Sequence, residues 1–263
     1  MDLGLGGNVA IITASSSGLG KASARALANE GVNVVINGRN KEKLSAAAEE
    51  IKEVSGSEVL SISGDIKKRE TLEKLVDRAL DRFGRLDHLV TSAGGPPSGN
   101  TLDTTEDDWY QGFDLLVMSV FRLVKKAVPA LREGDGGTIV NITSRSVKEA
   151  LDSLVLSNSI RMSVIGLEKT LSRELAPEIR VNSVLPGPHH TPRIDGLIDQ
   201  AMERGEFETR AEGLKEWGRS VPLKKMGNPD KLGSLVAFLS SPKASFINGA
   251  AIPVDGGSSR SNL

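Results

Sequence analysis

Residues 8–20 read Asn-Val-Ala-Ile-Ile-Thr-Ala-Ser-Ser-Ser-Gly-Leu-Gly, and the architecture of the chain follows from this segment. The first half is a run of β-branched residues, which predicts a buried strand over 8–13. The second half is a turn of small residues, and the apolar spacing that follows predicts a helix over 18–31. In such a turn the backbone can approach a pyrophosphate, and free N–H groups of the helix N-terminus face the anion. We therefore expect a nucleotide to bind here.

Strands and helices are predicted to alternate along the rest of the chain. The expected strands lie near 32–37, 59–62, 88–91, 138–142, 180–184 and 250–254, and the expected helices near 41–54, 69–83, 106–131, 154–175, 197–217 and 229–239. Strands that alternate with helices predict a parallel sheet covered by helices on both faces. No repeat or linker interrupts the pattern, so we expect one doubly wound α/β domain over residues 1–263.

The composition of the 263-residue chain excludes several classes of protein. Its 33 Lys and Arg residues balance 34 Asp and Glu residues. This balance argues against a protein that binds nucleic acid or an anionic membrane, because such a protein needs an excess of basic residues. There is no cysteine, and three histidines are too few for a metal site, so we expect no disulfide and no bound metal. Because we find no secretory signal and no long apolar run, we expect a cytoplasmic protein.

The turn at 13–20 resembles the T-G-x3-G-x-G turn of the short-chain dehydrogenase/reductase family, with Ala14 in place of the first glycine. Further segments resemble that family in the same order along nearly the whole chain: Asp65-Ile66, Thr91-Ser-Ala-Gly94, Ile139–Ser144, Arg180–Gly187 with Thr191, and Ile247–Gly257. The chain is most similar to the 3-oxoacyl-acyl-carrier-protein reductase-like members. The resemblance implies a Rossmann-type, seven-stranded parallel sheet and hydride transfer between a nicotinamide coenzyme and a carbonyl or alcohol substrate.

The resemblance also implies which residues bind the coenzyme. Asp65 and Ile66 match the pair that contacts adenine, and Thr191 lies in the loop at the nicotinamide. The full set is Thr13, Ser15, Ser16, Ser17, Gly18, Leu19, Gly20, Arg39, Asp65, Ile66, Ala93, Gly94, Arg161, Pro186, Gly187 and Thr191.

The end of the second predicted strand indicates which coenzyme is used. NAD binders place a carboxylate there for the ribose 2′-hydroxyl, whereas an arginine suits a 2′-phosphate. This chain reads Ile36-Asn-Gly-Arg39 and has no acid, which favours NADP(H) over NAD(H). The alternative is that Arg39 is a solvated loop charge. Family members that prefer NADP(H) often carry a basic residue in the glycine-rich turn, where this chain has Ser17.

The catalytic positions depart from the family pattern. The family uses a Ser that polarises the carbonyl, a Tyr that donates a proton, a Lys four residues later and an Asn on a preceding helix. Ser144 matches the family serine, and counting onward places Ser157 at the Tyr position and Arg161 at the Lys position. Leu116 stands at the Asn position, and the single tyrosine, Tyr110, lies in another helix. The catalytic candidates are therefore Ser144, Ser157 and Arg161.

The altered residues limit the chemistry. Arg161 cannot act as a base, but its fixed charge can bond either ribose hydroxyls or a substrate anion. Ser157 is a poor acid at neutral pH, so a bound water is one candidate for the proton relay. Lys148 is either a surrogate proton donor or a solvated loop charge.

Two further segments are candidates for the substrate side. The pair His189 and His190 follows Pro186-Gly187 and could face the substrate. The alternative is that the pair has no role in the site, because adjacent side chains in a loop rarely point to one ligand. The segment 193–219 resembles the substrate lid of the family; we expect its charges on a solvated face and Met202, Phe207, Leu214 and Trp217 over the substrate. The Gly94-Gly-Pro-Pro97 loop is expected to shape the mouth of the pocket.

Three functions are compatible with these residues. The first is an NADP(H)-dependent oxidoreductase with an altered catalytic site, acting on a small carbonyl or alcohol compound. The second is a catalytically silent NADP(H)-binding sensor or scaffold, and the third is an epimerase or dehydratase that uses a bound coenzyme. The resemblance further implies a homodimer or homotetramer that assembles through the helices near 106–131 and 154–175.

Overall fold

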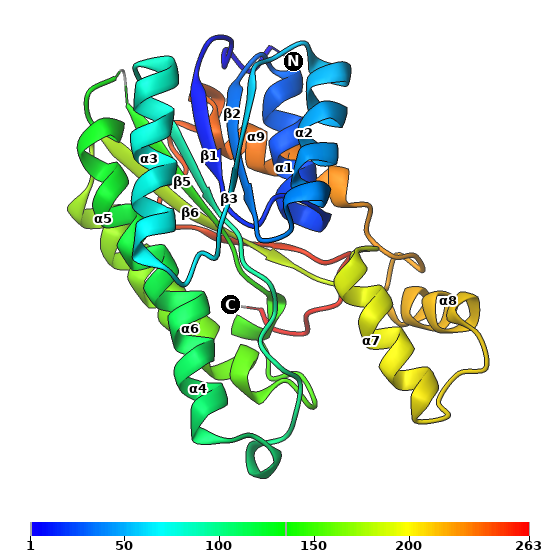
Figure 1. Ribbon diagram of the computed structural model, residues 1–263. Helices are drawn as coiled ribbons and strands as arrows, with labels where there is room; N and C mark the ends of the chain where they lie inside the picture. The colour runs from blue at the N-terminus through cyan, green and yellow to red at the C-terminus, as the bar shows by residue number, and fades with distance from the viewer. Residues whose placement is uncertain (1, 135, 263) are drawn as a thin grey trace.

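A sheet of seven parallel strands, in the order β3-β2-β1-β4-β5-β6-β7, forms the centre of the protein (Figure 1). The computed structural model describes residues 2–134 and 136–262. The strands are β1 (Val9–Ile12), β2 (Asn33–Gly38), β3 (Val59–Ser63), β4 (His88–Thr91), β5 (Gly137–Ile142), β6 (Ile179–Pro186) and β7 (Ala251–Val254). The prediction of a doubly wound, seven-stranded parallel sheet is confirmed. The order reverses between β1 and β4, and ligands of such sheets bind beside that point.

Helices cover both faces of the sheet. In chain order they are α1 (Gly18–Asn29), α2 (Lys41–Ser55), α3 (Arg69–Phe83), α4 (Glu106–Phe113), α5 (Ser119–Leu131), α6 (Val155–Glu174), α7 (Pro192–Glu203), α8 (Arg210–Ser220) and α9 (Pro229–Ser240). Figure 1 shows α1, α2 and α9 on one face and α3, α5 and α6 on the other, while α7 and α8 project from one edge.

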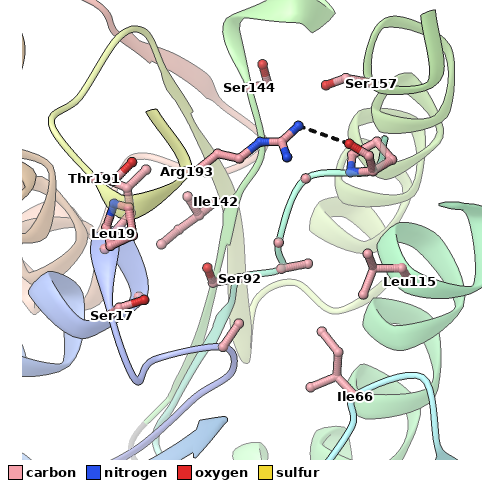
Figure 2. A pocket seen from close by; sticks show the side chains of 18 of the residues that line it. Ser17, Leu19, Ile66, Ser92, Leu115, Ile142, Ser144, Ser157, Thr191 and Arg193 are labelled. Atoms are coloured by element: carbon pink, nitrogen blue, oxygen red, sulfur yellow. Dashed lines mark hydrogen bonds between the residues drawn. The ribbon is translucent and has the colours of Figure 1, made fainter. Parts of the chain in front are cut away.

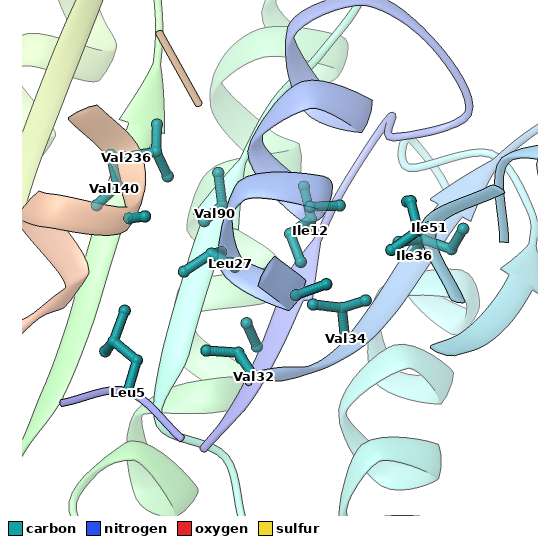
Figure 3. Packing of buried hydrophobic residues seen from close by; sticks show 14 of the residues in the cluster. Leu5, Ile12, Leu27, Val32, Val34, Ile36, Ile51, Val90, Val140 and Val236 are labelled. Carbon is teal, nitrogen blue, oxygen red and sulfur yellow. The ribbon is translucent and has the colours of Figure 1, made fainter. Parts of the chain in front are cut away.

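Alternate residues of each strand supply the two cores. On β1, Ala10 and Ile12 pack toward α1 and α9, whereas Val9 and Ile11 pack toward α3 and α5. Figure 3 shows the first of these cores, in which Ile12 and Val90 lie close to Leu27 of α1. Each fully buried aliphatic side chain contributes roughly 1.5–3 kcal/mol to folding. The two cores make the sheet a rigid base for the loops at its carboxyl edge.

Two predicted helices are wrong in detail. The helix expected over 106–131 is interrupted by a π-helical turn, Asp114–Met118, between α4 and α5. The helix expected over 197–217 is two helices, because Gly205 has a left-handed φ of +76° after α7 and the Thr209 side chain caps α8 by accepting from the Glu212 N–H. The apolar spacing on either side of each break is still helical, so the notion of one continuous helix in each segment was wrong only at the break.

His88 lies in the core, away from the candidate site. His88 is a buried core residue whose Nε2 accepts from Asn8 Nδ2 and whose Nδ1 donates to Thr138 Oγ1. Burial lowers the pKa of His88 to about 4, against the opposing charge of Asp87, so the ring is neutral at physiological pH. Within 2–134 and 136–262, no helix has the length and apolar character needed to cross a membrane, and no cluster of three potential metal ligands occurs.

Candidate active site

Side-chain hydrogen bonds hold the strand ends at the carboxyl edge of the sheet. Thr13 Oγ1 donates to the Ser92 carbonyl at 2.7 Å and accepts from the Ser92 N–H at 2.8 Å, which ties the end of β1 to the end of β4. Asn37, at the end of β2, donates to the carbonyl of Ile62 in β3 and to that of Gly64 just after β3. Ser15 Oγ donates to the Ile12 carbonyl and accepts from the Asn37 N–H. These bonds fix the floor of the site.

The glycine-rich turn packs tightly against the start of α1. A Cβ at Gly20 would lie 2.6 Å from the Ala14 carbonyl oxygen, so this position requires glycine. Gly18 has a φ of +57°, and Ala14 also adopts a left-handed φ, of +46°. Ala14 therefore holds the conformation that favours a glycine, which explains the glycine found there in the resembling family. The Ser17 side chain makes no capping bond, so the N-terminus of α1 faces the cavity without a side-chain cap.

A cavity of about 580 Å³ runs from this turn to α6. That volume is in the range of ordinary small-molecule and cofactor sites. The cavity brings together most of the residues predicted for coenzyme and substrate: Ser16, Ser17, Gly18, Leu19, Gly20, Arg39, Asp65, Ile66, Ala93, Gly94, Ser144, Ser157, Arg161, Pro186, Gly187 and Thr191. Distant parts of the sequence thus meet in one continuous space.

Thr13 and Ser15 are the two predicted coenzyme-binding residues that do not line the cavity. Both are buried, and their hydroxyls bond to the ends of neighbouring strands. Their side chains face the strand ends rather than the cavity, and their part in coenzyme binding stays a prediction. Because each satisfies a main-chain group at the sheet edge, they are positioning residues.

Ser144 and Ser157 lie at the end of the cavity away from Ser17 and Ile66 (Figure 2). Ser144 Oγ accepts from the Ser146 N–H at 3.1 Å, which leaves the Ser144 O–H free to donate into the cavity. Ser157, on α6, is buried, and its Oγ lies 3.2 Å from Ser146 Oγ. The two predicted serines are therefore linked through Ser146, which was not among the predicted site residues.

Arg161 follows Ser157 by one helical turn on the same face of α6 and is only 7% exposed. No hydrogen bond or ion pair to this guanidinium is found within the described part of the chain, and its Nε is a buried donor without a partner. Burial lowers the pKa of Arg161 to about 10, and the positive charge of Arg193 adds to this effect. Arg161 is still a cation at neutral pH, so the cavity contains a buried positive charge without a counter-ion.

Arg193 lies at the mouth of the same cavity. Its Nη2 donates to the Pro96 carbonyl at 3.0 Å, so the side chain bridges from α7 to the Gly94–Pro97 loop (Figure 2). Arg193 is exposed, as expected for the charges of the lid segment, but its side chain also lines the cavity, which the sequence did not indicate. The sequence around Arg193 has no pattern that distinguishes this arginine from the other charged residues of the segment.

The other predicted substrate-side residues are placed unequally. His189 is buried and lines the cavity; burial lowers its pKa, and its Nδ1 donates to the Gly187 carbonyl. His190 is exposed and lies 3.4 Å from Asp195. The described lining includes Gly94–Pro97 but not Lys148. The lid presents Ile194 and Leu197 to the cavity, whereas the described lining contains none of the four predicted residues, Met202, Phe207, Leu214 and Trp217.

The π-helical turn lies beside the cavity at the position of the family asparagine. Leu115 lines the cavity, while Leu116 is buried in a small apolar cluster with Leu156 and Ile160 of α6. The predicted substitution of this asparagine by Leu116 thus places an apolar side chain in the core and provides no polar group at the site.

Comparison with known proteins agrees with this geometry. A family profile described as enoyl-(acyl carrier protein) reductase matches residues 13–259. An uncharacterized oxidoreductase of Thermotoga maritima is 33% identical over 96% of this chain and 97% of its own length. A 3-oxoacyl-[acyl-carrier-protein] reductase of Staphylococcus epidermidis is 32% identical over 94% and 97%. The structure of L-sorbose reductase from Gluconobacter frateurii, complexed with NADPH and L-sorbose, superposes with a TM-score of 0.94 at 31% identity over 99% and 100%.

The chain belongs to the short-chain dehydrogenase/reductase family. It is thus a member of a family of oxidoreductases that use a nicotinamide coenzyme. Within this short-chain dehydrogenase/reductase, no tyrosine lines the cavity in the described ranges, and an arginine occupies the helix position four residues after Ser157.

Replacement of Arg161 by Met should stabilise the protein without ligand. The change removes a buried charge that has no partner and keeps a side chain of similar length, so we expect the free energy of unfolding to rise by roughly 1–2 kcal/mol. Urea unfolding of the purified protein measures this change. Arg180→Met is the matched control, because Arg180 donates to the Ile247 and Ser241 carbonyls and its loss should destabilise. A destabilised Arg161→Met variant would contradict the assignment of an unpaired cation.

Proposed function

We propose that this short-chain dehydrogenase/reductase is an NADP(H)-dependent oxidoreductase that transfers hydride between the coenzyme and a carbonyl or alcohol substrate. One observation carries the proposal. The glycine-rich turn and Arg39 line the same cavity as Ser144, Ser157 and Arg161. A catalytically silent binding protein would need the first half of this cavity but not a hydroxyl free to donate in the second half.

The residues at the turn fit a dinucleotide. Gly18 leaves the N-terminus of α1 accessible, and the close contact of Gly20 with the Ala14 carbonyl brings the backbone of the turn to the cavity wall. Arg39 is exposed, lines the cavity, as Lys67 also does, and has no ion-pair partner in the described residues. When bound, NADPH supplies the hydride. Arg39 would hold its 2′-phosphate, since an arginine matches phosphate geometry.

Ser144 would orient the substrate carbonyl. Because its oxygen already accepts from the Ser146 N–H, its hydroxyl hydrogen points elsewhere and can donate to the carbonyl oxygen of the substrate. Such a donor stabilises negative charge that develops on that oxygen as hydride arrives.

Completion of the alcohol also requires a proton. The buried pair of hydroxyls on Ser146 and Ser157 provides a short relay, with water as the source, because neither serine is acidic enough to give up a proton by itself at neutral pH. We propose this relay in place of the tyrosine of the family.

Fluorescence titration with NADPH, and with NADH in parallel, tests the coenzyme. We expect NADPH to bind the wild-type protein more tightly, and Arg39→Gln to weaken NADPH about 10–30-fold while NADH is unaffected, because one charge-assisted contact to phosphate is lost. Lys41→Gln is the matched control, since exposed Lys41 begins α2 and is not part of the described cavity wall. Equal loss of both coenzymes would assign Arg39 a general role, and no binding of either would overturn the proposed function.

Ser144→Ala tests the catalytic role. Turnover of a carbonyl substrate should fall by ~10²–10³, the usual effect of removing one donor to a developing oxyanion. The dissociation constant of NADPH, measured by fluorescence on the same variant, should remain unchanged. Unchanged turnover would remove Ser144 from the mechanism, and a wild-type protein that binds NADPH but reduces no carbonyl compound would support the silent alternative.

We also propose a homodimer or homotetramer that assembles through α5 and α6. Two large apolar side chains on these helices, Phe121 and Met162, remain 44% and 49% exposed. Light scattering of the wild-type protein should give a multiple of 27.9 kDa, and Phe121→Lys with Met162→Lys should shift the mass toward that of the monomer. A monomeric wild type would overturn this assembly.

A further inference from the structure

Two arginine side chains from different helices line the substrate end of the cavity. Arg161 enters from α6 and is buried, whereas Arg193 enters from the start of α7 and lies at the mouth. Arg161 has no protein partner within the described ranges, and Arg193 bonds only the neutral carbonyl of Pro96 there. Their charges are close enough that Arg193 lowers the pKa of Arg161.

No carboxylate lines this end of the cavity in the part of the chain that the structure describes. The single acid among the described lining residues is Asp65, which follows β3 at the opposite end. Three acids close in sequence to residues that line the cavity, or packed against one of them, have other partners: Glu149 pairs with Arg145, Asp195 lies near His190, and Asp255 accepts from the Ser259 hydroxyl and N–H. The protein therefore brings positive charge to the substrate end without neutralising it.

A buried charge without a partner is costly, and proteins rarely keep one unless a ligand supplies the opposite charge. Resting on the proposed function, we propose that the substrate carries an oxyanion group, a carboxylate or a phosphate, which Arg161 and Arg193 bind. The planar guanidinium presents paired N–H donors that match both groups. The carbonyl that accepts the hydride would lie at Ser144, and Leu115, Leu154, Ile194 and Leu197 would contact the apolar part of the substrate.

The competing role for Arg161 is a contact with the coenzyme ribose, as a lysine makes at this position in the family. The two roles differ in what the loss of the charge does. If Arg161 binds the coenzyme, its removal weakens NADPH. If it binds a substrate anion, its removal weakens charged ligands and leaves NADPH and neutral ligands unchanged.

The test is calorimetric titration of the protein, alone and saturated with NADPH, with two matched pairs of ligands. Phenylglyoxylate is compared with its methyl ester, and dihydroxyacetone phosphate with dihydroxyacetone, so that the carboxylate and phosphate arms are separate. We expect the charged member of at least one pair to bind at least tenfold more tightly than its neutral partner. Arg161→Gln and Arg193→Gln should each weaken that charged ligand about 30-fold or more, because each leaves an anion with one cation.

Three controls make the result specific. Arg161→Lys keeps a positive charge and should retain much of the preference for the charged ligand. Arg204→Gln removes the same charge from the exposed far end of α7, outside the described cavity wall, and should change nothing. The dissociation constant of NADPH for Arg161→Gln should stay within about threefold of wild type, which is less than the loss of one ordinary contact.

The outcomes separate this inference from the proposed function. Equal binding of charged and neutral partners in both pairs, or no binding of any of the four ligands, overturns the anion site even if NADPH binds. Loss of NADPH affinity in Arg161→Gln with an intact charge preference also overturns it and assigns Arg161 to the coenzyme. If the wild-type protein binds the charged ligand more tightly than its neutral partner but binds no nicotinamide coenzyme, the anion site is supported and the proposed oxidoreductase function is overturned.

Discussion

Hydrogen bonds from side chains to main chain at the carboxyl ends of β1, β2 and β4 are the constraint on which the site depends. Thr13, Ser15 and Asn37 each satisfy backbone groups that would otherwise end unpaired at a buried sheet edge. An unpaired buried backbone group costs about 1–3 kcal/mol, so these contacts fix where each loop leaves the sheet. The glycine-rich turn, the loop after β4 and Ser144 consequently meet at one cavity although they are far apart in sequence.

Much of the fold could be predicted because the relevant signals are local. The short apolar strands, such as Val9–Ile12, and the glycine turn before α1 lie within a few residues of one another. Ser157 and Arg161 on α6 could also be placed together, because residues four apart share one helix face. What the spacing could not show is which way a single side chain turns. Thr13 and Ser15 face the sheet, and Arg193 reaches across to Pro96, because of partners on other strands and loops.

The buried guanidinium of Arg161 represents a balance between stability and function. A methionine or leucine would fill the same space without desolvating a charge, and a folded chain has no need of a cation there. Proteins keep such destabilising residues mainly at functional sites, where binding of a ligand offsets the loss of stability. Under our proposal, the arginine four residues after Ser157 recognises a substrate anion and does not take over the role of the family lysine.

The π-helical turn between α4 and α5 determines which side chain of this segment lines the cavity. A π turn contains one residue more than an α-helix of the same path, and each residue of an α-helix rotates the chain by about 100°. Deletion of a single residue within Asp114–Met118 would restore regular winding and turn Leu115 away from the cavity. The cavity wall next to Ile66 would then present a different neighbour of Leu115 to the substrate. A one-residue insertion or deletion here is thus a short evolutionary route to a new pocket shape while the sheet and both flanking helices stay in place.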